Sequence, residues 1–144
     1  MNIPKTLEEF QDEFYKSIDL IDQIGDLRIR QFIQRLNNVS NDIVVSSVLY
    51  VIGNNQRPLT EHIDQKYAGI ILNEYCPKTE LDVVTVLKST LQNWNKSIEE
   101  FPFWIRENYG IEIVRNGLIE FEKSNLNEIE KDKLQTIKWW LRIL

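Results

Sequence analysis

Apolar residues recur at helical spacing along most of the 144-residue chain. In the first segment they fall within about an 80° sector of a helical wheel that turns roughly 100° per residue; they are Leu7, Phe10, Phe14, Ile18 and Ile21. Thr6, followed three residues later by Glu9, has the form of a capping box. The pattern therefore predicts a helix from Leu7 to about Gly25, where glycine ends or kinks it.

The same reasoning predicts most of the remaining chain to be helical. Pro77 should stop the helix that Thr60 caps, and Gly110 should end another. Two starts are possible for the helix that ends at Gly110. Ser97 and Glu100 form a second capping box, but Pro102 also suits a first helical position. The other expected helices cover residues 26–36, 61–75, 79–94, 111–123 and 127–144.

Residues 42–52 are the ambiguous segment, because Ile, Val and Tyr dominate it. These residue types favour a buried strand, but the segment is also long enough for a buried helix. A strand needs a partner for its backbone groups, and the two other β-branched stretches read better as helix. We therefore predict a buried helix that ends near Gly53.

These elements predict an all-α fold of about eight helices in a single domain, residues 1–144. Short connections favour an irregular bundle of antiparallel neighbours. The sequence Asp42-Ile-Val returns as Asp82-Val-Val forty positions later. Because this spacing is close to the length of a HEAT repeat, a HEAT-like helical stack remains the alternative arrangement.

Composition places the chain among ordinary globular proteins, with 42% hydrophobic and 27% charged residues. Cys76 is the one cysteine, so no disulfide can form within the chain. A reducing, cytoplasmic location is therefore expected. The sequence lacks an apolar run of about 18 residues, so we expect no membrane-spanning helix.

The residue types that carry most enzyme chemistry are sparse. His62 beside Glu61 could form an oriented base, but a surface histidine at a helix start is the plainer interpretation. One His and one Cys do not make a zinc site, and five isolated glycines do not make a phosphate-binding loop. We therefore predict a non-enzyme without a metal or cofactor. An enzyme that uses carboxylates and a metal ion is the remaining alternative.

Charge is distributed unevenly, and this asymmetry provides the first functional lead. Residues 1–26 hold seven acids and two lysines, which equals the whole net charge of −5. Four of these acids share about an 80° sector of the first helix, with Tyr15 in its middle; they are Glu8, Asp12, Asp19 and Asp22. The arginines at 28, 30 and 35 could neutralise part of this row. Otherwise the row is a docking face for a basic partner, with Tyr15 as its anchor.

Aromatic residues are concentrated between positions 94 and 109; they are Trp94, Phe101, Phe103, Trp104 and Tyr109. Most of them should belong to the core. Phe101, Phe103 and Trp104 cannot share one helical face, so at least one should reach a surface or groove. This cluster predicts an alternative function, the binding of a small molecule or lipid in an apolar cavity.

The C-terminal helix has two apolar sides. One side carries Leu134, Ile137, Trp140, Leu141 and Leu144, and Trp139 with Ile143 forms the other. Two-sided burial within the domain is one interpretation, and a homodimer through this helix is the other.

The leading hypothesis is a non-catalytic protein-interaction module that binds a basic protein partner through its acidic first helix. An immunity or antitoxin protein that masks a cationic toxin is a concrete form of this hypothesis, because an acidic face imitates phosphate and accelerates encounter. Nucleic acid is not an expected partner, since the chain lacks a continuous basic surface.

Overall fold

A computed structural model describes residues 3–54 and 56–143 of the chain. Within these residues all regular structure is helical, which confirms the all-α class. The α-helices are α1 (Leu7–Asp19), α2 (Ile21–Ile24), α3 (Leu27–Gln34), α4 (Asn41–Gly53), α5 (Glu61–Tyr75), α6 (Val83–Thr90), α7 (Glu100–Tyr109), α8 (Ile111–Glu122) and α9 (Glu128–Leu141). Two 3-10 helices, η1 (Arg35–Asn38) and η2 (Pro58–Thr60), precede α4 and α5.

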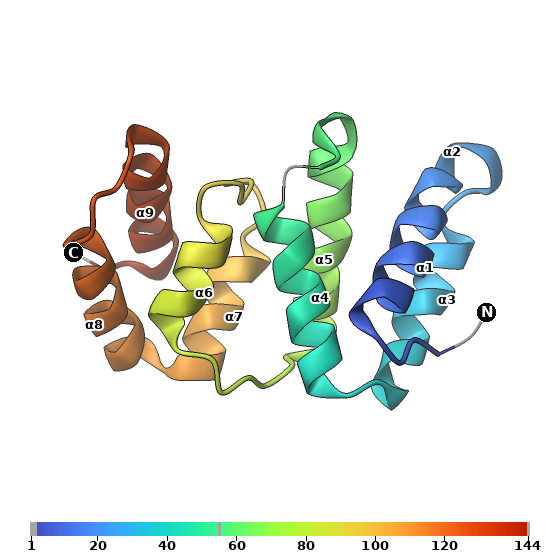
Figure 1. Cartoon of the computed structure of the whole chain (residues 1–144), viewed down its shortest axis with the longest axis horizontal. Helices are drawn as coiled ribbons and strands as arrows, with labels where there is room; N and C mark the ends of the chain where they lie inside the picture. Colours follow the sequence, from blue (N-terminus) through green and yellow to red (C-terminus); the bar gives the residue numbers. More distant parts are fainter. Residues whose placement is uncertain (1–2, 55, 144) are drawn as a thin grey trace.

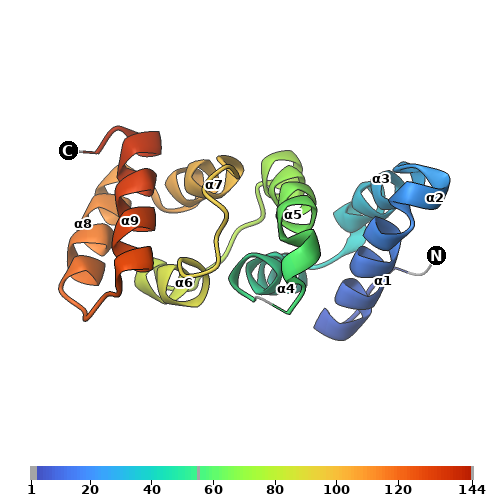
Figure 2. The same cartoon turned by 90° about the horizontal axis from the view of Figure 1, so that it is seen from above.

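The helices follow one another along an elongated molecule, with the two ends of the chain at opposite ends (Figure 1). One row of contacts runs from α1 through α4 and α6 to α8, and a second runs from α5 through α7 to α9. Viewed from above, the helices form two layers along the long axis (Figure 2). Asp42 and Asp82 lie at the starts of α4 and α6, which are neighbours in the first row. A relation to HEAT repeats stays a prediction.

The segment 42–52 is helical, because it forms nearly all of α4. The Oγ of Ser40 caps this helix by accepting a hydrogen bond from the amide of Ile43. Val48 and Ile52 are completely buried, so the β-branched residues that suggested a strand are core residues of a central helix. Burial between neighbouring helices outweighs the weak intrinsic preference of valine for strands.

The first predicted helix is divided into two. The Oγ1 of Thr6 caps α1 as predicted, accepting from the amide of Glu9 at 3.1 Å. The second bond of a capping box would join the Glu9 carboxylate to the amide of Thr6. The carboxylate accepts instead from the amide of Lys5. A break at Leu20 separates α1 from the single turn α2, which ends at Gly25 with φ of 75°.

Two predicted helix starts are wrong. α6 begins after Asp82, whose carboxylate accepts from the amide of Val84, whereas Thr79 stabilises a turn before it by accepting from the amide of Leu81. α7 begins at Glu100 without the predicted box at Ser97. Pro102 is neither the first residue of α7 nor a break in it. It lies within the first turn, where a backbone N–H would have no helical acceptor.

The C-terminal helix is shorter than predicted. α9 begins with a capping box between Asn127 and Glu130 and ends at Leu141, where Arg142 takes a left-handed conformation with φ of 56°. The predicted Leu144 lies outside the described residues. Within the described chain, none of the helices is long and apolar enough to cross a membrane.

Glycines set the spacing of the α4–α6–α8 row at two points. A Cβ atom on Gly53 would lie 2.0 Å from the carbonyl oxygen of Ser89, at the end of α6. A Cβ atom on Gly117 of α8 would lie 2.4 Å from Cγ1 of Val83. These helices therefore approach so closely that alanine does not fit at either position without movement.

Candidate functional site

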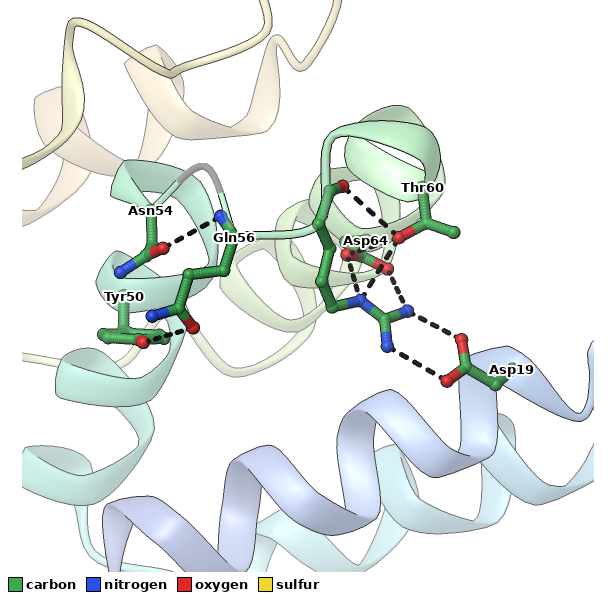
Figure 3. A network of polar contacts seen from close by, with 7 residues as sticks. Asp19, Tyr50, Asn54, Gln56, Thr60 and Asp64 are labelled. Carbon is green, nitrogen blue, oxygen red and sulfur yellow. Dashed lines mark hydrogen bonds and ion pairs between the residues drawn. The ribbon is translucent and has the colours of Figure 1, made fainter.

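Arg57 is the centre of a polar network between α1, α5 and the loop before η2. Its guanidinium forms two hydrogen bonds to each of two carboxylates, at 2.7 and 3.0 Å to Asp19 and at 3.0 and 3.1 Å to Asp64. It also lies 4.3 Å from the ring centroid of Tyr15. Figure 3 shows Asp19, Thr60 and Asp64 converging on this point from different elements. The network joins the N-terminal helix to the centre of the molecule.

Burial controls the ionisation of these groups. The Asp64 side chain is 6% exposed, and burial raises its pKa although Arg57 and Thr60 donate hydrogen bonds that lower it. Burial lowers the pKa of Arg57, but its bonds to Asp19 and Asp64 outweigh this and raise it overall. Burial and the Asp64 carboxylate raise the pKa of Tyr15 to about 12, with Arg57 opposing them. Arg57 is thus the firmly charged partner that compensates two acids.

The predicted acidic row is therefore divided in its roles. Asp19 is paired with Arg57, and Tyr15 is half-buried beneath the same guanidinium. Glu8, Asp12 and Asp22 are exposed, and among residues 3–54 and 56–143 no ion pair to them is found. The structure thus leaves three of the four predicted acids accessible and uses the fourth inside the fold.

Arg28 and Arg30, which were expected to neutralise part of the acidic row, pair with other acids instead. Arg28 forms hydrogen bonds at 2.8–3.1 Å to Glu13, which lies outside the row. Arg30 pairs with Asp26, the N-cap residue of its own helix four positions earlier. The Arg28–Glu13 pair joins α3 to α1, and neither pair covers Glu8, Asp12 or Asp22.

The aromatic cluster is divided between core and surface. Phe101 is 0% and Trp104 is 2% exposed, and the Nε1 of Trp104 donates to the carbonyl oxygen of Pro77 at 2.8 Å. Phe103 is only partly buried, as expected for a ring that cannot share their face. It lines an open groove of about 1310 Å³ to which neither Phe101 nor Trp104 contributes. Phe101 and Trp104 are core residues rather than walls of a ligand cavity.

The groove lies between α7 and α9, and three of its ten lining residues are aromatic. The Trp140 ring lies 5.9 Å from that of Phe103 and 4.8 Å from that of Trp139, measured between centroids. Trp139 is 70% exposed. Arg106 of α7 and Arg142 at the end of α9 complete the lining together with Asp132, Gln135, Thr136, Lys138 and Ile143. Sequence reasoning identified Phe103 and the second apolar side of the last helix, but not that they meet.

The residues considered for catalysis are dispersed. His62 is exposed, and its Nδ1 lies 3.4 Å from the Oγ of Ser97. Asp64 faces Arg57 rather than the imidazole. Cys76 follows the last residue of α5, whereas His62 is in its first turn. In the part of the chain that the structure describes, no cluster of three or more His, Cys, Asp or Glu residues is arranged to hold a metal ion.

The fold and these two surfaces place the chain in the class of all-α proteins with an acidic end and an aromatic groove. Comparisons with protein-family models, with curated proteins and with solved structures found no match.

Proposed function

We propose that this chain is a non-catalytic protein-interaction module that binds a basic protein partner through the exposed acids of α1 and α2. The observation that carries the proposal is the exposure of Glu8, Asp12 and Asp22 without ion-pair partners among the residues described. Glu8 and Asp12 lie on neighbouring turns of α1 and repel one another, so a cationic surface that approaches them gains favourable energy on contact.

The way α1 is held supports this proposal. Asp19 is paired with Arg57 and Glu13 with Arg28, so the helix that presents Glu8 and Asp12 is fixed at two points. A fixed surface loses less conformational entropy on binding than a mobile one. A rigid acidic surface suits an immunity- or antitoxin-type protein that masks a cationic toxin, which is the concrete form of the proposal.

The anchor of this surface differs from the one the sequence predicted. Arg57 covers the Tyr15 ring, and the phenol is half-buried, so Tyr15 supports the surface rather than inserting into a partner. The proposal therefore rests on electrostatics, with a binding rate that falls as salt is added.

A charge-reversal experiment tests the proposal. The tagged protein and its variant E8K/D12K/D22K are used to capture proteins from a native lysate at low and high salt. The control E80K/E107K/E120K makes the same change in net charge at exposed acids on other elements. A basic protein captured by the wild type and the control but not by E8K/D12K/D22K supports the proposal. If every partner remains bound to E8K/D12K/D22K, the acidic surface is not the binding site.

Three further expectations belong to this proposal. The partner is a protein rather than a nucleic acid, and the lone Cys76 fits a reducing, cytoplasmic compartment. A homodimer through the C-terminal helix is an alternative use of the exposed Trp139, and sedimentation over a range of concentrations would test it.

A further inference from the structure

The α7–α9 groove combines aromatic rings with two arginines that lack a carboxylate partner among the described residues. Arg106 stacks over Phe103, with its guanidinium carbon 5.1 Å from the ring centroid. Arg142 is exposed at the end of α9. Across residues 3–54 and 56–143, neither guanidinium has a carboxylate within ion-pair distance. Both are therefore available to an anionic group that enters the groove.

The other charged side chains of the groove are already paired. Asp132 accepts a hydrogen bond from Lys96 at 2.7 Å, and Lys138 pairs with Glu122. Asp132 is therefore compensated by a lysine outside the groove and does not neutralise the two arginines. The groove retains a local positive charge although the chain as a whole carries −5. This local excess favours an occupant with negative charge.

We infer that the α7–α9 groove binds an acidic linear peptide segment of a protein partner, with a bulky apolar side chain packed against Trp139 and Trp140. The planar guanidinium of arginine matches a carboxylate with two parallel hydrogen bonds. Tryptophan and arginine are the residue types that most often dominate binding energy at protein interfaces. Gln135 and Thr136, which also line the groove, can bond to the backbone of an extended segment.

The charge distribution favours a peptide over a nucleic acid. A nucleic acid carries a phosphate at every nucleotide and is held by many cations along its path. Here two unpaired arginines are confined to one groove of an acidic protein. Their charge fits a short segment with two or three carboxylates. This inference goes beyond the acidic surface of α1 and α2, and either could fail without the other.

The test begins with a random peptide library displayed on phage and selected on the folded wild-type protein. The expected result is enrichment of sequences in which Asp or Glu flank Trp, Phe or Leu. A synthetic peptide of the enriched sequence is then titrated against wild type, R106E/R142E and W139F, with Trp fluorescence as readout. R106E/R142E should weaken binding at least about tenfold. W139F should reduce the fluorescence change, because Trp139 is the exposed ring and Trp140 remains beside it.

The control variant K78E/K123E makes the same change in net charge at exposed lysines on other elements and should bind like the wild type. Circular dichroism shows whether each variant remains folded. W139F keeps an aromatic ring at position 139, whereas R106E/R142E reverses the charge of the groove, so the two variants test different parts of the inference. The inference is overturned if no sequence is enriched, if basic sequences are enriched, or if R106E/R142E binds the peptide undiminished. It is also overturned if oligouridylate displaces the peptide, or if sedimentation shows a dimer that forms in wild type but not in R106E/R142E or W139F.

Discussion

The two arginine sites of this protein differ in what surrounds the guanidinium. Arg57 has five hydrogen bonds from its side chain, two carboxylate partners and an aromatic ring beneath it. Arg106 also covers an aromatic ring, but among the described residues it has no carboxylate partner. The same residue type thus completes the fold in one place and remains available in the other.

This difference separates residues that act in stability from residues that act in binding. A charged side chain with all its partners inside the molecule is costly to remove, because its partners are then left buried and unpaired. A charged side chain without partners costs little to remove but changes what the surface attracts. The predicted acidic row contains both kinds, since Asp19 belongs to the Arg57 network while Glu8 and Asp12 do not.

Among the changes at the charged residues and the groove, the largest expected effect is that of Arg57→Ala. This variant leaves Asp64, whose side chain is 6% exposed, without its cation, and the free energy of unfolding should fall by about 3 kcal/mol. Chemical denaturation measures this loss. Arg106→Ala is the matched control and should lose under about 1 kcal/mol. Replacing both Arg57 and Asp64 with apolar residues should recover much of the stability. If Arg57→Ala and Arg106→Ala lost the same free energy of unfolding, the two sites would not differ in their role.

The second effect concerns the ionisation of Tyr15. Its pKa is raised from 10.0 to about 12, so the folded state holds the phenol proton more tightly than the unfolded state. The resulting stabilisation is present below pH 10 and is lost as pH rises toward 12. The difference in ultraviolet absorbance between wild type and Tyr15→Phe during alkaline titration measures this pKa. A midpoint at the ordinary tyrosine value would show that the ring is not enclosed beneath Arg57.

A smaller effect is expected at the Glu13–Arg28 pair. Burial raises the pKa of Glu13, but its hydrogen bonds with Arg28 and the positive charge of that residue outweigh burial and lower it. The pair therefore stabilises the fold above the ordinary value of 4.5, and this contribution is lost as pH falls below it. Unfolding measured on both sides of this value should show a weaker pH dependence for Glu13→Gln than for wild type. An unchanged slope would mean that the pair does not contribute.

The smallest effect is expected for Trp139→Ala in the groove. The side chain is 70% exposed and packs mainly against Trp140, so the free energy of unfolding should fall by only about 0.5 kcal/mol. The thermal unfolding midpoint should therefore change little. The matched variant Trp94→Ala removes a side chain with 0% exposure and should lose about 4 kcal/mol. A large loss for Trp139→Ala would show that this ring belongs to the core.

The helices were predictable because apolar spacing and caps are local signals. The Oγ1 of Thr6 caps α1, and Gly25 and Gly110 end helices as their backbone freedom suggested. The start of α6 was not predictable from Thr79, because Asp82 offers an equally good cap closer to the buried valines. Both predicted starts of α7, at Ser97 and at Pro102, were wrong, because the helix begins at Glu100.

The candidate sites depend on contacts that a local pattern does not contain. Arg57 lies 38 positions from Asp19, and nothing in the spacing of either residue predicts their bond. Phe103 and Trp140 come from different helices whose packing alone forms the groove. The double apolar character of the last helix was the one local signal of that groove, because it left Trp139 70% exposed.

The opposite positions of the first and last helices also determine how the molecule responds to force (Figure 1). Tension applied at the two ends of the chain runs along the long axis of the helical rows, and each helix is loaded through its neighbours in turn. The first helices would then detach from the centre as a unit, and the bonds between Arg57 and Asp19 would resist that step. Mechanical strength at this end therefore depends on the Arg57–Asp19 bonds and on the packing of α1 against α4, whereas the α4–α6–α8 row depends on close contact at Gly53 and Gly117.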